Sequence, residues 1–408
     1  MLDFSDKPYV FVPPAPNRLF MWFLRQVNRW RMLPGPRHRI PQVRVLGGEA
    51  VKVAQERAGT RIVFMANHPS HSDAEILSEA QRQIGVPSLY MAAYDVFLRK
   101  KFEGWCMQRA GAFSVDREGS DKPSMKAAIQ AMAAGDFAMS IFPEGNVYLC
   151  NDCPTPFLDG AAFMALKAQQ QLADGETLAI VPVSIKLSYV DDIRPALRQR
   201  LATLPGAAAE GDVLAVLTAV GDTLLAEALS ARGLAIPDAE SLRDRLEAAA
   251  AAVIVTLETK MDLKPRGDGL IDRVRAIRRR VHQIRIDAES ARANPDAEAW
   301  ADDAILALRI LSYTGDYLLD HPSLDRVAES IEKLLEDHHG GMRQPPIGTR
   351  QAYVRFGDPL FVADFADGGR SREIVQALTT AAEASVAAGI AAINAANPHA
   401  GGQRFSER

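Results

Sequence analysis

Short apolar runs alternate with helical patterns along residues 43–192, and this alternation constrains the fold more than any other feature of the sequence. The apolar runs are RIVFMA (61–66), SLYMAA (88–93), FAMSIF (137–142) and LAIVPVSIKL (178–187). Each is short and continuous, as buried strands are, and helical patterns lie between them. The alternation therefore predicts an α/β fold in which helices flank both faces of a mixed sheet.

The pattern changes after residue 192. Residues 193–336 are rich in Ala, Leu and Arg and have helical periodicity with almost no strand signal, and HHGGMRQPPIGTR (338–350) follows as a linker. This pattern predicts a large α-helical insert (193–349) of five to seven helices. Strand character returns at 351–362, and a last helix is expected at about 371–396. We therefore expect an N-terminal arm with a basic amphipathic helix (1–40), a core (41–192), the α-helical insert (193–349), and the last core strand with the C-terminal helix (350–408).

Residues 17–33 (NRLFMWFLRQVNRWRML) predict a helix that begins at Asn17 as its N-terminal cap. Its aromatic residues, among them Phe20, Trp22 and Trp30, are interleaved with arginines, which suits the head-group region of an anionic membrane. The alternative is a helix packed on its own domain, with the arginines on its solvated face. No run of 18 or more apolar residues is present, so any membrane contact is expected at the surface.

Composition narrows the class of protein. The formal net charge of −4 argues against bulk binding of nucleic acid. Three cysteines do not form a disulfide scaffold, and the first residues do not resemble a signal peptide, so we expect a cytoplasmic protein. Any surface contact with a membrane is then expected to be peripheral, at its inner face. The pair Cys150 and Cys153 is interpreted as incidental loop thiols, because the further ligands or fold that a zinc or redox role needs are not evident.

Residues 64–73 (FMANHPSHSD) join the end of an apolar strand to His68 and Asp73. Open α/β sheets place their sites beyond the carboxyl ends of strands, where His68 is expected to lie. A carboxylate that accepts a hydrogen bond from one imidazole nitrogen fixes the tautomer and raises the basicity of the other nitrogen. Such a pair can take a proton from an alcohol that attacks an acyl group.

Two other interpretations of this stretch stay open. His68 and Asp73 are also compatible with an ordinary helix-capping pair. A metal site formed by His68, His71 and Asp73 is less favoured, because this spacing is unusual for zinc and no further Cys/His cluster completes it. His71 is most simply a solvated loop residue.

Three further blocks follow in order: GAFSVDR (111–117), FPEGN (142–146) and IVPVS (180–184). Together with NHPSHSD they resemble the glycerolphosphate and lysophosphatidic acid acyltransferase superfamily. The resemblance covers about residues 40–192 and 351–363 and implies an acyltransferase-like core. The residues that match the four blocks are Asn67, His68, Ser70 and Asp73; Gly111, Phe113 and Arg117; Phe142, Pro143, Glu144 and Gly145; and Val181, Pro182 and Val183.

The resemblance implies transfer of a fatty acyl group from acyl-CoA or acyl-carrier protein to the hydroxyl of a glycerophosphate or lysophospholipid-type acceptor. No metal or resident cofactor is expected for this reaction. His68 would be the general base, Asp73 would orient it, and Arg117 would hold a phosphate. The residues expected to bind substrate are Asn67, Ser70, Gly111, Phe113, Arg117, Phe142, Pro143, Glu144, Gly145, Asn146 and Pro182.

One departure from the family pattern bears on the acceptor. The third block commonly continues with Thr-Arg, whereas this chain has Asn146 and Val147. The missing arginine is usually tied to the acceptor phosphate, so the acceptor is less well defined than the reaction type. Alternative activities are a thioesterase or esterase that uses the same pair on water, acylation of a non-glycerolipid alcohol, or non-catalytic lipid binding on the same core.

The insert contains a basic amphipathic helix at 270–286 (LIDRVRAIRRRVHQIRI). Its apolar seam is expected to pack into the insert, with the arginines on the wet face. Contact between this helix and anionic lipid or an acidic acyl-carrier protein is the other interpretation.

Overall fold

The computed structural model describes residues 8–98, 100–117, 121–208, 210–265, 269–366 and 369–406. The first seven residues of the expected N-terminal arm lie outside these ranges. The chain divides into two compact units. We call residues 9–191 with 348–402 the sheet unit, and residues 192–347 with Pro8 and 403–406 the helical unit, and we describe each by itself.

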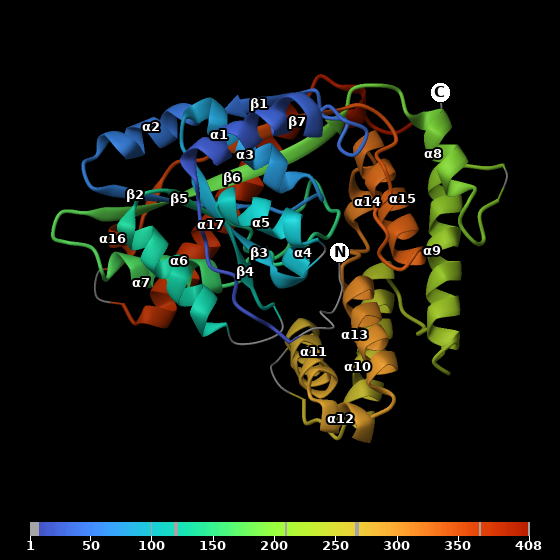
Figure 1. Cartoon of the computed structure of the whole chain (residues 1–408). Helices are drawn as coiled ribbons and strands as arrows, with labels where there is room; N and C mark the ends of the chain where they lie inside the picture. The colour runs from blue at the N-terminus through green and yellow to red at the C-terminus, as the bar shows by residue number, and fades with distance from the viewer. Residues whose placement is uncertain are drawn as a thin grey trace. The chain divides into compact units, whose positions relative to one another are not determined.

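The sheet unit contains a mixed sheet, as the sequence predicts (Figure 1). The strand order is β1-β7-β6-β2-β5-β3-β4, with β8 paired to β6. The central strands β6, β2, β5, β3 and β4 are parallel neighbours, whereas β7 and β8 run antiparallel to β6. The strands are β1 (Gln42–Leu46), β2 (Thr60–Ala66), β3 (Ser88–Ala93), β4 (Ala112–Val115), β5 (Ala138–Ile141), β6 (Thr177–Tyr189), β7 (Arg350–Phe356) and β8 (Leu360–Phe361).

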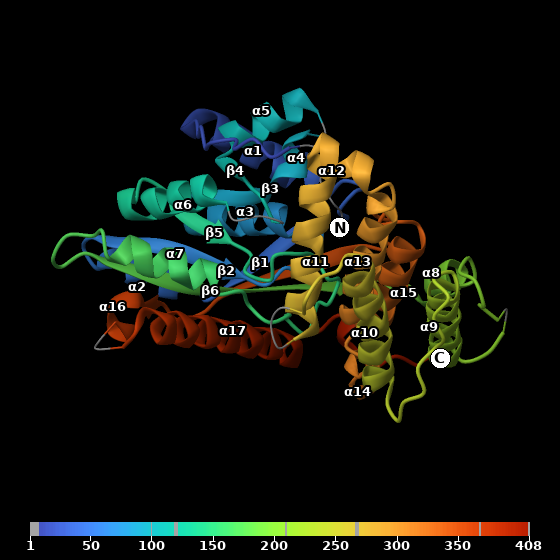
Figure 2. The ribbon, with the colours of Figure 1, turned by 90° about the horizontal axis from the view of Figure 1, so that it is seen from below.

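Helices cover both faces of the sheet because its strands are apolar on both sides. In β2, Val63 and Met65 belong to the core on the α6, α7 and α17 side, while Ile62 and Phe64 belong to the core beneath α2 and α3. Figure 2 shows α17 running alongside β6. The helices of this unit are α1 (Arg18–Val27), the π-helical turn η1 (Asn28–Met32), α2 (Gly48–Glu56), α3 (Asp73–Ile84), α4 (Tyr94–Leu98), α5 (Lys101–Arg109), α6 (Lys122–Ala134), α7 (Gly160–Gln169), α16 (Val362–Phe365), α17 (Ser371–Ala395) and the 3-10 turn η2 (Ala400–Gly402).

The N-terminal segment follows its expected course with one difference. Asn17 caps α1, because its side chain accepts a hydrogen bond of 2.9 Å from the backbone N–H of Phe20. The predicted helix over 17–33 ends its regular α-helical part at Val27 and continues as η1. Before α1, the backbone N–H of Ser114 donates to Val12 at 3.0 Å, so the arm lies along the edge strand β4.

The helical unit is α-helical in its described residues, as predicted. It has eight α-helices there rather than the five to seven expected, because two of them are only six and four residues long. The predicted apolar seam of α11 is buried with α10 and α13 at Val274, Ile277, Val281 and Ile284. The helices are α8 (Arg194–Leu201), α9 (Val213–Ser230), α10 (Leu242–Lys260), α11 (Leu270–Ile286), α12 (Ala288–Ala293), α13 (Ala297–Leu311), α14 (Tyr317–Asp320) and α15 (Leu324–His338).

Two helices of the described chain, α9 and α17, are long and apolar enough to cross a membrane by length and composition. This differs from the expectation that no segment would qualify, which was based on uninterrupted apolar runs; Asp222 and Glu227 interrupt the run in α9. One or two such helices are weak evidence for a membrane span, because core helices pass the same test. In the sheet unit, α17 packs against β6 and α7 as a core helix does.

Candidate active site

The parallel order of the central strands brings four chain segments to one edge of the sheet. Strands β2, β5, β3 and β4 are neighbours in that order and point the same way, so their carboxyl ends share an edge. His68 follows β2, Phe142 follows β5, Asp95 follows β3, and Arg117 follows β4. This edge is where open α/β sheets place their sites.

His68 is held by the carboxylate of Asp73. The Nδ1 atom of His68 lies 2.8 Å from Oδ2 of Asp73, and Asp73 is fully buried. The same carboxylate accepts hydrogen bonds from the backbone N–H of Ser70 at 2.8 Å and from the Ser70 hydroxyl at 2.6 Å. Because an ionised carboxylate only accepts hydrogen bonds, Nδ1 is the donor, and in the neutral imidazole Nε2 of His68 therefore carries the lone pair.

These bonds distinguish the pair from an ordinary helix cap. Asp73 is the first residue of α3, and a capping side chain accepts hydrogen bonds from backbone N–H groups inside the helix. The hydrogen bonds of Asp73 instead come from Ser70 and His68, which precede the helix. The position at a helix N-terminus also favours the negative charge of the carboxylate.

Glu144 fixes the backbone of His68 from the neighbouring strand end. Its Oε1 accepts a hydrogen bond of 2.7 Å from the backbone N–H of His68, and its Oε2 accepts from the backbone N–H and the hydroxyl of Thr155. Burial raises the pKa of Glu144 above its ordinary value, although these hydrogen bonds oppose the shift. Phe142 stacks on the His68 imidazole, with 4.3 Å between ring centroids.

A tight turn after β5 sets the direction of the Asn146 side chain. Gly145 has a φ of +77°, in the left-handed region that favours glycine, and its N–H donates to the carbonyl of Phe142 at 3.1 Å. The next residue, Asn146, therefore points to the end of β4. Its Oδ1 accepts a hydrogen bond of 2.9 Å from Arg117, whose guanidinium also lies 3.4 Å from a carboxylate oxygen of Asp95. Arg117 is thus tied to the same edge as His68.

Side-chain amides complete the sheet where β2 ends. Asn67 donates to the carbonyl of Ile185 at 2.9 Å and accepts from its N–H at 2.7 Å, as a paired strand would. Asn151 makes the same two bonds with Leu187, at 2.6 and 2.9 Å. Asn67 therefore fixes the start of the turn that carries His68.

Most of the predicted substrate-binding residues are buried and support the site from inside the sheet unit. Arg117, Phe142, Gly145 and Asn146 are partly exposed at the sheet edge, and their substrate contacts stay predictions. The buried ones support the edge from within: Phe113 is fully buried in the core, and the positive φ of Gly111 places it close to Leu89 at the entry to β4. The buried predicted residues are Asn67, Ser70, Gly111, Phe113, Pro143, Glu144 and Pro182.

Three contacts of the site were not anticipated from the sequence: those of Thr155, Asp95 and Asn151. Thr155 and Asn151 lie in the loop after FPEGN, which has no regular pattern, and Asp95 lies in the segment MAAYDVF. Asp95 lies two residues after the end of β3, so proximity to a strand end could have indicated it. Asn151 and Thr155 lie ten and fourteen residues after the end of β5, and no sequence signal indicates them.

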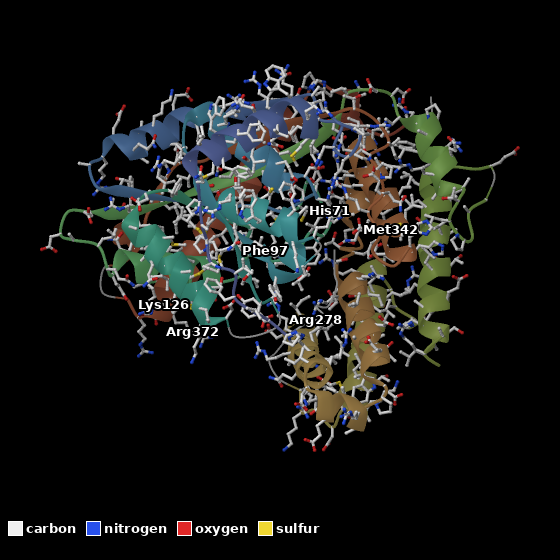
Figure 3. The ribbon with its side chains drawn as sticks, viewed as in Figure 1. His71, Phe97, Lys126, Arg278, Met342 and Arg372 are labelled. Carbon is white, nitrogen blue, oxygen red and sulfur yellow. The ribbon has the colours of Figure 1, made fainter. Side chains whose placement is uncertain are left out.

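The remaining sequence motifs do not extend the site. His71 lies on the turn between β2 and α3 (Figure 3) and takes no part in the His68–Asp73 hydrogen bond. Among the described residues, no group of three or more His, Cys, Asp or Glu side chains is arranged to hold a metal ion. Cys150 is buried and Cys153 is exposed.

A carboxylate-held imidazole at the carboxyl edge of a parallel sheet defines a site suited to base catalysis on a hydroxyl. Residues 42–186 match the family model described as Acyltransferase, and this segment contains every residue predicted for the site. The match confirms the resemblance to the glycerolphosphate and lysophosphatidic acid acyltransferase family. The chain thus contains an acyltransferase domain, which supports acyl transfer and a role in lipid metabolism. A search of curated proteins finds no match.

Proposed function

We propose that the sheet unit transfers a fatty acyl group from acyl-CoA or acyl-carrier protein to the hydroxyl of a glycerophosphate or lysophospholipid-type acceptor. The observation that carries the proposal is the 2.8 Å contact between Nδ1 of His68 and the fully buried Asp73. This contact leaves Nε2 as the basic nitrogen, and the His68 side chain is 22% exposed, so an acceptor can reach it.

In the proposed reaction, Nε2 of His68 takes the proton of the acceptor hydroxyl as its oxygen attacks the thioester carbonyl. A C–O bond forms, the C–S bond breaks, and the imidazolium returns the proton to the departing thiolate. The charge of Asp73 stabilises the imidazolium in between. A thioester is already activated, so deprotonation and alignment are the main tasks of the protein.

Arg117 is the proposed anion-binding group of the acceptor site. Its guanidinium is oriented by Asn146 and lies beside the carboxylate of Asp95 at 3.4 Å, so an incoming anion competes with a negative charge already present. Val147 occupies the position of the family's second arginine and offers no positive charge. This balance favours an acceptor with a singly charged phosphodiester, as in a lysophospholipid with a head group, over a doubly charged phosphomonoester.

We further propose that the sheet unit works at an anionic membrane surface. Trp22 and Trp30 of the N-terminal segment are 60% and 65% exposed, and Phe102 of α5 is 72% exposed. Phe20 and Trp105 join α1 to α5 through an edge-to-face contact with 5.2 Å between ring centroids. Figure 2 shows the ribbons of these two helices next to each other. We give one name, the aromatic surface, to Leu19, Phe20, Trp22, Phe23, Trp30, Phe102 and Trp105. Exposed Arg29, Arg31, Lys100 and Lys101 accompany it.

Large exposed rings beside cations match the head-group region of an anionic bilayer, where rings sit among head groups and cations meet phosphates. Arg29 stacks over Trp30 at 4.6 Å, which places a cation at the rim of the aromatic surface. A soluble protein rarely exposes this much clustered apolar surface without a partner.

The acyl-transfer proposal is tested by incubating the purified protein with radiolabelled long-chain acyl-CoA, or acyl-carrier protein, and a panel of glycerol phosphate, lysophosphatidic acid and lysophospholipids with head groups. We expect labelled acylated product, with higher kcat/KM for the phosphodiester acceptors. His68→Ala should lower kcat about 10²- to 10⁴-fold, the usual contribution of a positioned base. His71→Ala, three residues away on the same turn, is the matched control and should retain activity.

Each other outcome rules out a stated part of the proposal. Free fatty acid without acylated product would identify a thioesterase or esterase that uses the same pair on water. Product only with non-glycerolipid alcohols would reject the acceptor class. Equal turnover in His68→Ala and wild type would reject the mechanism.

The membrane proposal is tested by co-sedimentation with vesicles of phosphatidylcholine alone or mixed with phosphatidylglycerol. Binding should require the anionic lipid and weaken in Trp22→Ser and Phe102→Ser. Val53→Ser, which changes an exposed apolar residue on α2, is the control and should bind as wild type does. Wild-type protein that stays in the supernatant with anionic vesicles would reject this part of the proposal.

A further inference from the structure

A second histidine reaches the catalytic turn from the N-terminal segment. His38 is almost fully buried, and its Nδ1 lies 2.8 Å from the hydroxyl oxygen of Ser72. The backbone N–H of Ser72 donates to the hydroxyl oxygen of Ser70 at 3.1 Å, and that hydroxyl donates to Oδ1 of Asp73 at 2.6 Å. Hydrogen bonds to the side chain and the backbone of Ser72 therefore connect His38, through Ser72 and Ser70, to the carboxylate that holds His68.

A second contact from the same segment holds the first turn of α3. Asn28, buried at the start of η1, donates from Nδ2 to the carbonyl of Glu75 at 2.8 Å. Glu75 lies two residues after Asp73. A π-helical turn is uncommon and is often found at functional sites, and here it presents Asn28 to α3. The segment 28–40 thus contacts both sides of Asp73.

His38 is itself held firmly. Its carbonyl accepts a hydrogen bond of 2.7 Å from the side chain of Arg350, and its N–H donates to Gly35 at 3.1 Å. The next residue, Arg39, has a φ of +51°, a left-handed conformation that costs a non-glycine residue free energy. The backbone N–H of Arg350 donates to the carbonyl of Arg39 at 2.8 Å and keeps it there. Strand β7 therefore fixes the place of His38.

We infer that His38 and Asn28 are positioning residues for the His68–Asp73 pair. The direction of the Asp73 carboxylate is set by Ser70, and the place of Ser70 and Asp73 is set by the turn that His38 holds through Ser72. A misplacement of about 1 Å is enough to lower the rate of a catalysed reaction strongly. The inference rests on the proposed function and adds two residues that its motifs do not include.

The test compares three variants at His38 in the acyl-transfer assay. His38→Ala removes the contact with Ser72 and should lower kcat about 3- to 10-fold, the range of one hydrogen bond, with unchanged KM. His38→Asn places a polar atom near the position of Nδ1 and should restore kcat, whereas His38→Gln places it farther out and should not. A merely structural role predicts no such difference between Asn and Gln at equal stability, which thermal unfolding of each variant checks.

A double-mutant cycle tests the contact of His38 with Ser72. Ser72→Ala should lower kcat as His38→Ala does, and the double variant should show no further loss, because both changes break the same contact. Asn28→Ala should lower kcat independently. Additive effects of His38→Ala and Ser72→Ala, or wild-type kcat in His38→Ala, would overturn the inference.

A readout without substrate separates this inference from the proposed function. In protein labelled with ¹⁵N-histidine, the Nδ1–H signal of His68, assigned by its loss in His68→Ala, should be sharp in the wild type. In His38→Ala it should broaden as the hydrogen bond to Asp73 loosens, and in His38→Asn it should stay sharp. A wild type that transfers no acyl group but shows these changes would reject the proposed function alone, and an unchanged signal in His38→Ala would reject the inference alone.

Discussion

The ion pair between Lys186 and Asp152 allows a quantitative test of how the loop beside the site is held. Lys186 lies in β6 and is 1% exposed, and Asp152, in the loop after the FPEGN block, is 3% exposed. The same carboxylate oxygen accepts a hydrogen bond of 3.0 Å from Asn394 of α17. Water therefore has almost no access to either charge, and the values measured for buried ion pairs apply rather than those for surface pairs.

Removing one partner leaves the other charge buried without this counter-ion. Lys186→Met or Asp152→Leu should therefore lower the free energy of unfolding by about 3–5 kcal/mol. At about 2–4 °C per kcal/mol for a domain of this size, the midpoint of thermal unfolding should fall by roughly 6–20 °C. The double variant Lys186→Met/Asp152→Leu buries no charge and should lose less than the sum of the two single changes, because apolar replacement of a buried pair is often neutral.

The assay is urea unfolding followed by tryptophan fluorescence, and the control is a second ion pair in the sheet unit. Arg61 and Glu176 form a hydrogen-bonded pair of 2.8 Å but are 21% and 32% exposed, so water screens them. Their coupling in a double-mutant cycle should be about 0–1 kcal/mol. A coupling for Lys186 and Asp152 no larger than this, or a loss below about 1 kcal/mol in Lys186→Met, would refute the reasoning.

Three further predictions concern the site and its frame. Asp73→Asn keeps the shape of the side chain but removes the charge that is proposed to stabilise the imidazolium. Steady-state kinetics should therefore show kcat lowered about 10- to 100-fold, in line with about 1.5–3 kcal/mol for a charge-assisted hydrogen bond, and a nearly unchanged KM. A kcat within a factor of two of wild type contradicts this. Burial raises the pKa of Glu144 above 4.5, so the folded protein binds the proton of this carboxyl more tightly than the unfolded chain does. The protonated Glu144 therefore contributes to the free energy of unfolding below pH 4.5, and this contribution is lost as the pH rises through the raised pKa. In urea unfolding at several pH values, the stability of Glu144→Gln relative to wild type should therefore increase as the pH rises above 4.5, and a decrease would show the sign to be wrong. Phe113→Ala should cost about 3–5 kcal/mol of unfolding free energy, as for other fully buried Phe side chains, without changing KM; a raised KM at unchanged stability would instead make Phe113 a substrate contact.

Local patterns in the sequence were sufficient to locate most elements of the sheet unit. The run SLYMAA coincides with β3, and the run RIVFMA with all but the first residue of β2, because a strand buried on both faces is marked by its own apolar residues. The helical pattern at about 95–109 predicts one helix, whereas the structure divides it into α4 and α5. A Cβ on Gly104 would lie 2.8 Å from the carbonyl oxygen of Phe97, so the two helices approach closely at a position that only glycine allows. Helical periodicity does not reveal such a break.

The site required information that local patterns do not contain. The motif residues His68, Glu144 and Arg117 were identified from the sequence. The contact of Glu144 with His68 and that of Arg117 with Asn146 depend on the order in which β2, β5, β3 and β4 pair. Asn67 bonds to Ile185, 118 residues away, only because β6 pairs with β2 and extends beyond its end. Each hydrogen bond of this kind joins a loop to a strand that is distant in sequence, and its geometry is set by the register of the sheet. Sequence motifs can therefore identify a proposed catalytic residue such as His68 without identifying the residues that position it.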